Sequence, residues 1–480
     1  MLNIKNIYVF IYFIPLNKTK SNLILSMKKN FEKWLNDNSI TEVECLVPDL
    51  GGIARGKILP TKKFIQGLNH DSHRLPQSVF IQTISGGYAG EDEELPLEVY
   101  NPTDIDVILR PDINTLRNVP WYDDPTAQVI CDAVNLNGTS VINSSRSALK
   151  KILKLYEDIG YQPIVSPEVE FYLVKPNPDP DYPLEVPIGQ SGREETGKQA
   201  FGIDAVNEFD NLFEDVYSFC EQQNIEIDTI NHESGSAQME INFQHGDPLE
   251  LADQVFLFKR TLRQAALKRK LYATFMAKPM ENQPGSSLHL HQSLIKKKNK
   301  KNVFFSKTST ISNIMKNYIA GLQIYTPKLM PIHAPNINSY RRLFATWDAP
   351  KNTHWGLGNR SCGFRIPSNE EHSMRIENRI SGSDTNPYLV FAANLAAGYL
   401  GIKNKLKPTP EMKKSVFGKD KSMLPKNVEE AVSLFENDEK INEVFNQKFI
   451  RTISAIRRAE NQAYLKVISS WEREYLLLNV

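Results

Sequence analysis

The sequence predicts an α+β protein of two domains, in which a small mostly-β domain precedes a larger domain of helices and strands. Near the start, apolar side chains alternate over residues 43–47, and residues 53–59 return after an Asp-Leu-Gly-Gly turn, which is typical of a β-hairpin. The composition changes at residues 143–160, where apolar side chains follow a helical period. Beyond this point, strand-like segments with charged faces recur between helices.

The first 26 residues are expected to be an extension that is disordered or not native. Residues 7–16 form an apolar run after Lys5, and a signal peptide is the alternative interpretation. The run is too short to span a bilayer and lacks a small-x-small cleavage site. Met27 directly precedes an amphipathic helix whose apolar side chains share one face.

We expect the first domain, a small β domain with Gly- and Pro-rich loops, to occupy residues 27–140. The second domain, residues 141–480, begins with a helix whose apolar side chains recur at i, i+3, i+4 and i+7 behind a serine cap. Within it, residues 205–223 and 247–270 have helical periods, and residues 175–198 read as a long loop. Residues 387–400 are apolar all round, which predicts a buried helix.

The charge balance excludes several classes of partner. Lys and Arg number 57 against 56 Asp and Glu, so no global field attracts nucleic acid or a membrane surface. The four cysteines are scattered without a Cys-x-x-Cys pair, which favours a reduced, cytoplasmic protein over a disulfide framework or a thiolate zinc site. Partners are therefore expected at a specific site.

Two strand-like segments of the second domain carry carboxylates on one face. Glu168 and Glu170 alternate with apolar residues, so an extended backbone points both carboxylates the same way. In a later segment, Glu240 alternates with apolar residues in the same manner. Glu233 comes just before it, and a Ser-Gly-Ser turn can fold the Glu233 carboxylate back toward Glu240.

Two further segments carry histidine and arginine in the same alternating pattern. His289 and His291 share a face, and Arg375, Glu377 and Arg379 share another. For any one segment, a half-exposed surface strand is the simpler interpretation. The composition argues against it, because solvated faces usually mix Lys, Thr, Ser and Gln, whereas these faces use Glu, His and Arg almost alone.

If these faces converge, their chemistry indicates a site for two cations and phosphate. Carboxylates with one imidazole suit Mg²⁺ or Mn²⁺, which prefer oxygen ligands. Arginines suit phosphate, because a planar guanidinium can bind two of its oxygens. The combination indicates phosphoryl transfer. No Gly-x-x-x-x-Gly-Lys-Ser/Thr loop occurs, which excludes a Walker-type ATPase.

Six motifs, in order along the chain, resemble those of the glutamine synthetase family, from about Met27 to Val480. They are Glu-x-Glu at Glu168, His-Glu…Gln-x-Glu at His232, Gly-Ser-x-x-His-x-His at Gly285, Asn-Ser-Tyr-x-Arg-Leu at Asn338, Asn-Arg-Ser…Arg-Ile-Pro at Asn359, and Arg-x-Glu-x-Arg…Asn-Pro-Tyr at Arg375. The resemblance implies a β-grasp first domain and a catalytic α/β second domain whose antiparallel sheet lines the active site. It also implies homo-oligomers of stacked rings, with each site shared across an interface.

By motif, the resemblance assigns the candidate residues to ligands. The first metal site would use Glu170, Glu233 and Glu240, and the second would use Glu168, His289 and Glu377. ATP would be held by Arg360, Arg365 and Arg375, with His291 and Ser293 also at the nucleotide. Glutamate would be held by Gly285, Arg342 and Arg379. Arg360, Asp348 and Glu377 would take part in catalysis.

The implied reaction has two steps. The γ-carboxylate of glutamate attacks ATP to give γ-glutamyl phosphate, and an amine then displaces phosphate. Metals and arginines would neutralise the charge that keeps a carboxylate away from a triphosphate. Exclusion of water would protect the acyl phosphate from hydrolysis.

The acceptor is expected to be an organic amine or polyamine such as putrescine. Ammonia-using members of the family carry Asp-Gly-Ser-Ser in the first domain, and this motif occurs nowhere in the sequence. Three stretches instead resemble the γ-glutamylpolyamine (γ-glutamylputrescine) synthetase branch. They are residues 49–57, Trp355-Gly…Asn359-Arg360, and the Trp-Glu-Arg-Glu-Tyr ending at Trp471. A glutamine synthetase that uses ammonia is the alternative.

Two further departures from the ammonia users concern the site itself. Gln283 and Pro284 occupy the place of an asparagine before the glycine, which would alter how glutamate is held. Asp348 lies about where ammonia users have a glutamate that closes the site. It is interpreted as a shortened gate or a base for the amine, or equally as a surface aspartate. A non-catalytic sensor or structural assembly is the alternative of another class.

Overall fold

The computed structural model describes residues 18–68, 70–90, 95–97, 99–308, 310–345, 349–368, 370–417 and 423–480. Residues 1–17 of the expected extension and Asp348 lie outside the described residues. The chain has an α+β fold, which confirms the predicted fold class. It divides into two compact units. The first comprises residues 1–47, 54–76 and 106–140, and the second comprises residues 48–53, 77–105 and 141–480.

A six-stranded sheet forms the centre of the first unit, with strand order β2-β1-β6-β4-β3 and β5 paired to β6. Strand β1 pairs with β6 in parallel, and β6 pairs antiparallel with β4. The predicted hairpin is formed by β1 and β2. Their backbones approach so closely at Gly56 that a Cβ there would lie 1.8 Å from the Cys45 carbonyl oxygen, so only glycine fits. The elements are α1 (Lys18–Asp37), β1 (Glu42–Pro48), β2 (Ala54–Pro60), α2 (Thr61–Leu68), β3 (Arg74–Pro76), β4 (Asp106–Pro111), η4 (Ile113–Thr115), β5 (Arg117–Asn118) and β6 (Thr126–Val134).

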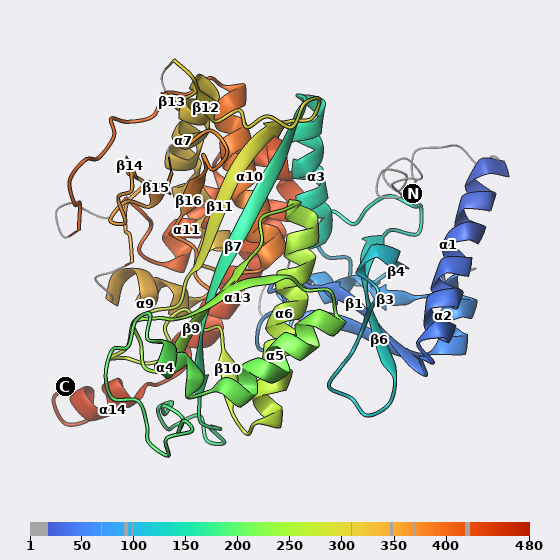
Figure 1. The fold of residues 1–480 in the computed structure, drawn as a ribbon, viewed down its shortest axis with the longest axis horizontal. Coiled ribbons are helices and arrows are strands. Elements are labelled where there is room, and N and C mark those ends of the chain that lie inside the picture. Colours follow the sequence, from blue (N-terminus) through green and yellow to red (C-terminus); the bar gives the residue numbers. More distant parts are fainter. Residues whose placement is uncertain are drawn as a thin grey trace. The chain divides into compact units, whose positions relative to one another are not determined.

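The second unit is built on an eight-stranded sheet of order β14-β15-β16-β11-β7-β9-β8, with β10 paired to β7. All pairs with described register are antiparallel except β14 with β15. The long strands β7 and β11 run side by side through the unit (Figure 1) and pair over nine residues, from Leu288 opposite Val169 to Lys296 opposite Tyr161. The strands are β7 (Tyr161–Val174), β8 (Ile227–His232), β9 (Gln238–Phe243), β10 (Tyr272–Thr274), β11 (Leu288–Lys296), β14 (Trp355–Leu357), β15 (Phe364–Ile366) and β16 (Ile376–Asn378), with a separate pair β12 (Phe305–Ser306) and β13 (Thr310–Ile311).

Helix α10 (Pro387–Lys403) is the buried centre of the helical layer, as its uniformly apolar sequence predicts. It contacts α3 (Ser145–Asp158), α6 (Pro248–Lys268) and α7 (Asn313–Tyr325), and both α3 and α6 contact β7. The contact with α7 depends on glycine, since a Cβ at Gly321 would lie 2.1 Å from the Ala397 carbonyl oxygen. No helix in the described part of the chain is long and apolar enough to cross a membrane.

The remaining helices are short or lie toward the C-terminal end of the chain. They are η3 (Gln77–Ile81), α4 (Ile203–Asn207), α5 (Asp210–Gln222), η5 (Thr326–Leu329), α8 (Met330–His333), α9 (Ile337–Ala345), α11 (Val428–Glu436), α12 (Glu439–Phe445), α13 (Gln447–Leu465) and α14 (Ser470–Leu476). The prediction of a single helix over residues 205–223 is wrong, because the helix is interrupted between α4 and α5. Phe209 leaves helical geometry there, with φ −120° and ψ 26°, and the Glu208 carbonyl accepts a hydrogen bond from Gln190 N instead.

Candidate active site

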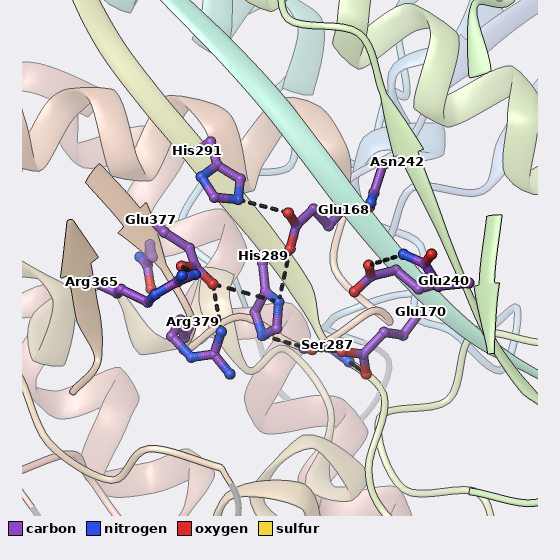
Figure 2. Close-up of polar contacts among 12 residues, drawn as sticks. Glu168, Glu170, Glu240, Asn242, Ser287, His289, His291, Arg365, Glu377 and Arg379 are labelled. Atoms are coloured by element: carbon purple, nitrogen blue, oxygen red, sulfur yellow. Dashed lines mark hydrogen bonds and ion pairs between the residues drawn. The ribbon is translucent and has the colours of Figure 1, made fainter. Parts of the chain in front are cut away.

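The sheet of the second unit brings the four charged faces together. Register places Glu168 on β7 opposite His289 on β11, and Glu170 opposite Glu240 on β9. His291 lies opposite Glu377 on β16. Directly opposed residues of neighbouring strands have side chains on the same face of a sheet. Figure 2 shows these carboxylates and imidazoles pointing toward one another over β7 and β11.

One end of this face holds three carboxylates, those of the buried Glu170 and Glu240 and of the half-buried Glu233. One oxygen from each lies within 4.8 Å of the other two. The Glu170 carboxylate accepts hydrogen bonds from Ser287 N (2.7 Å) and Ser287 Oγ (2.5 Å). Asn231 Nδ2 donates to Glu240 Oε1 over 3.3 Å. These neutral donors leave the mutual repulsion of the carboxylates in place.

The pKa values of these three carboxyl groups rise for a common reason. Burial and the neighbouring Glu240 raise the pKa of Glu170 to about 7. Burial and Glu170 raise the pKa of Glu233 to about 7, and burial and Glu168 raise the pKa of Glu240 to about 8. A divalent cation would relieve this repulsion, and oxygen donors are what Mg²⁺ and Mn²⁺ prefer. The donor set therefore fits such an ion.

Glu168 lies at the centre of the face, between two imidazoles. Its Oε1 is 2.7 Å from His291 Nε2, and its Oε2 is 3.3 Å from His289 Nδ1. Burial opposes ionisation, but the two histidines outweigh it and lower the pKa of Glu168. Ligand atoms of Glu168, His291 and Glu377 lie within 4.8 Å of one another, and so do those of Glu168, Glu240 and His289. Both groups combine oxygen with imidazole nitrogen.

The other end of the face holds guanidinium groups around Glu377. Arg365 Nη1 lies 2.8 Å from Glu377 Oε2, and Arg379 Nη1 lies 2.5 Å from Glu377 Oε1. Nε of Arg365 and Nε of Arg379 are buried without a hydrogen-bond partner in the described part of the chain. Arg375 Nε donates to His291 Nδ1 over 3.1 Å. Unpaired buried donors beside the carboxylates provide a place for an anion.

The candidate residues for glutamate and the nucleotide are distributed unevenly. Arg342 is buried, and its guanidinium donates to the Ile380 carbonyl (2.7 Å) and the Arg379 carbonyl (3.1 Å). Gly285 packs against it, since a Cβ at this position would lie 2.5 Å from Arg342 Cγ. Ser293 follows His291 on the same face of β11. Arg360 is exposed in the turn between β14 and β15.

Two residues of this region were not predicted as site residues from the sequence. Ser287 donates twice to Glu170, and its alternation with His289 and His291 was a signal that could have identified it. Glu195 comes from the long loop after β7 and accepts hydrogen bonds from Ala237 N (2.7 Å) and His232 Nε2 (3.0 Å). No local pattern in the sequence indicates that Glu195 contacts Ala237 and His232.

Comparison with known proteins identifies the family. Residues 143–476 match the family model "Glutamine synthetase, catalytic domain". The chain is 29% identical to a glutamate–isopropylamine ligase of a Pseudomonas species, over 92% of this chain and 95% of that protein. It is 30% identical to γ-glutamylputrescine synthetase PuuA of Escherichia coli, over 94% of each. Relatives named glutamine synthetase match at 28% and 30% identity.

A solved structure described as a GmaS/ADP complex has the same fold. It superposes with a TM-score of 0.77 at 25% sequence identity, over 93% of this chain and 98% of that one. The match of the catalytic-domain model to most of the chain, together with these relatives, shows that the chain belongs to the glutamine synthetase family of ATP-dependent glutamate–amine ligases.

Proposed function

We propose that this ligase joins the γ-carboxyl group of glutamate to an organic amine through a γ-glutamyl phosphate intermediate. The observation that carries the proposal is the polarised face of the sheet. Three carboxylates repel one another at one end, and two guanidinium groups at the other have a buried Nε with no hydrogen-bond partner among the described residues. ATP brings a chain of phosphates that must be bound through cations and arginines together. This face offers both on neighbouring strands of one sheet.

The proposed roles follow from the geometry of the two ends. Glu170, Glu233 and Glu240 hold one divalent cation, and Glu168 holds a second with Glu377 and an imidazole. His291 and His289 both contact Glu168, so either can supply the nitrogen. Bound cations would supply charge neutralisation between the glutamate carboxylate and the triphosphate.

Arginines take the anionic groups of the substrates in this proposal. Arg365 and Arg375 hold phosphate oxygens, and Arg379 holds glutamate, because their guanidinium groups border the Glu377 carboxylate or His291. Arg342 supports the glutamate site by holding the backbone there, since its guanidinium donates to the carbonyls of Arg379 and Ile380. Arg360, which is exposed in the turn between β14 and β15, also binds ATP in this proposal, on the basis of its family motif.

The organic acceptor rests on sequence and on relatives. The chain lacks the Asp-Gly-Ser-Ser motif of ammonia users, and its relatives include ligases named for isopropylamine and putrescine. Ammonia is the second candidate, because relatives named glutamine synthetase match at similar identity.

We also propose that the protein works as a homo-oligomer. The support lies in the last residues of the second unit, where large apolar side chains are exposed around α14. Trp471 is 61% exposed, Leu477 75% and Leu478 91%. Several large apolar side chains exposed on one short segment are typical of protein interfaces.

The test is an acceptor screen with purified protein. Phosphate release with ATP, glutamate and Mg²⁺ is measured with ammonia, methylamine, isopropylamine, putrescine or spermidine, and the γ-glutamyl product is identified by mass spectrometry. We expect turnover with at least one organic amine at a kcat/KM at least about tenfold above that with ammonia, a difference of about 1.4 kcal/mol in transition-state binding. Turnover with ammonia alone would overturn the proposal that the acceptor is an organic amine. No turnover with any amine would overturn the ligase reaction.

A further inference from the structure

The turn that carries Glu233 joins β8 to β9 and adopts a strained conformation. Glu233 N donates to the Gln238 carbonyl over 2.8 Å, and Gln238 N donates to the Gly235 carbonyl over 3.1 Å. Between them, Ala237 has φ +54°, in the left-handed region that a residue with a Cβ adopts at a cost. Such a conformation persists only where the surrounding structure enforces it.

Glu195 supplies that enforcement from the loop between β7 and α4. Its Oε2 accepts hydrogen bonds from Ala237 N over 2.7 Å and from His232 Nε2 over 3.0 Å. His232 is fully buried, and its Nδ1 lies 2.7 Å from the Glu233 carbonyl oxygen. Phe201 N, from the same loop as Glu195, donates to the His232 carbonyl over 2.9 Å. The Glu195 carboxylate thus forms hydrogen bonds to the chain on both sides of Glu233, at His232 and at Ala237.

Glu233 needs this support because its own side chain is weakly held. In the part of the chain that the structure describes, the hydrogen bond to its carboxylate is from Ser234 N, at a long 3.3 Å. The carboxylates of Glu170 and Glu168 repel it, and the positive charge of Arg379 offsets this repulsion only in part. Side-chain contacts therefore do not fix the position of Glu233 against its neighbours, and the backbone of the turn must do so.

We propose that Glu195 is a positioning residue for Glu233. Through His232 and Ala237 it holds the turn in the conformation that presents the Glu233 carboxylate to a divalent cation shared with Glu170 and Glu240. The inference rests on the proposed metal-binding role of Glu233. Groups that orient metal ligands from behind commonly change metal affinity by about 10- to 100-fold when removed.

The neighbouring residue provides a matched control. Glu194 lies on the same loop, but its carboxylate pairs with Lys175 Nζ at the surface (2.5 Å). Glu195→Ala removes both hydrogen bonds to the turn, whereas Glu194→Ala removes a surface ion pair, which contributes little to stability. Glu195→Gln keeps an acceptor oxygen for Ala237 N, and its amide group replaces Oε1, which is buried without a partner among the described residues. Glu233→Ala removes the ligand itself.

The experiment measures Mn²⁺ binding by electron paramagnetic resonance, without substrates, on the full chain and the four variants. We expect Glu195→Ala to weaken one class of Mn²⁺ site by about 10- to 100-fold, as Glu233→Ala does, with Glu194→Ala unchanged. Glu195→Gln is expected to weaken Mn²⁺ binding less, by about threefold or more. The side chain keeps an acceptor oxygen but loses the negative charge that strengthens its hydrogen bonds. In turnover assays, the KM for the cation rises more than kcat falls.

The outcomes separate the two proposals. If Glu233→Ala weakens Mn²⁺ binding while Glu195→Ala binds like Glu194→Ala, the positioning role is wrong and the metal site stands. If Glu233→Ala binds Mn²⁺ like the unaltered protein, the proposed metal site itself is wrong. Should Glu195→Ala fail to fold by circular dichroism, Glu195→Gln decides, and unaltered Mn²⁺ affinity in that variant overturns the inference.

Discussion

Glu377 shows how a single buried carboxylate can serve both the fold and the site. It is fully buried with a guanidinium on either side, from Arg365 and Arg379. Burial opposes its ionisation, but Arg379 and the nearby histidines outweigh burial and lower the pKa of Glu377 to about 2. The residue is therefore ionised throughout the physiological pH range. Its negative charge is what keeps two cationic side chains together on the sheet.

Glu377→Ala is expected to abolish metal-dependent phosphate release, with turnover reduced by about 100-fold or more. The variant removes a proposed metal ligand and leaves two guanidinium groups without their buried partner. The latter effect should cost about 3 kcal/mol of unfolding free energy. Phosphate-release assays and urea denaturation measure the two effects separately.

Glu371→Ala is the control, because Glu371 is an exposed glutamate on the segment that leads to β16. It should change neither quantity. If Glu377→Ala dissociated the oligomer but turned over at the normal rate, the site assignment would be wrong.

At the scale of the strands, the face shared by β7 and β9 stores unfavourable charge. The pKa values of Glu170, Glu233 and Glu240 are about 7, 7 and 8, above the ordinary value of 4.5. The folded chain therefore binds more protons than the unfolded chain between these limits. The resulting stabilisation is complete below pH 4.5 and is lost as the pH rises through 7 to 8.

We expect the thermal stability gained on adding Mg²⁺ to a chelated sample to grow as the pH rises from about 6 to about 8. The cation competes with protons for the same carboxylates, so binding releases protons. Differential scanning fluorimetry with EDTA or Mg²⁺ across this range measures the effect.

Glu240→Gln removes the most strongly raised group and should flatten the pH dependence. Buried Lys259 acts in the opposite direction, because burial lowers its pKa to about 7, so the comparison with Glu240→Gln isolates the carboxylates. A gain from Mg²⁺ that is independent of pH in the unaltered protein would contradict the coupling.

The sequence predicts these elements better than it predicts their partners. Alternation predicted a strand around Glu240, which is β9, and placed Glu240 on its polar face. Periodicity could not show that Glu208 would give its carbonyl to Gln190, which breaks the helix expected there. Local patterns record which way a side chain points, whereas partners distant in sequence depend on strand register and on the paths of loops.

At the scale of the whole molecule, the same limit applies to the site. Four polar faces could be read one at a time, but their convergence on β7, β9, β11 and β16 follows from strand order. The grouping of His291 with Glu168 and Glu377 follows from register, since His291 lies opposite Glu377. The role of Glu195 could not be predicted from the sequence, because Glu195 and His232 lie in separate segments that no common periodic pattern links.

The exposed apolar side chains around α14 lead to a prediction about assembly. Leu477→Ser with Leu478→Ser should lower the mass of the particle in solution, because both side chains are largely exposed and would be buried against another subunit. Light scattering after size-exclusion chromatography measures the mass. Leu97→Ser, at a side chain 74% exposed elsewhere in the second unit, is the control. An unchanged mass at every protein concentration would exclude this surface as an interface.

The placing of Glu168 between two imidazoles has a practical consequence for handling the protein. Imidazole nitrogen with carboxylate oxygen favours Zn²⁺, Ni²⁺ and Cu²⁺ over Mg²⁺, following the general affinity order of divalent metals. The three-carboxylate end, which offers oxygen alone, has no such preference for nitrogen-seeking ions. Trace zinc in a buffer, or nickel leached from an affinity column, would therefore accumulate at the Glu168 end first. Samples for kinetic work should be stripped with a chelator and reloaded with magnesium of known purity.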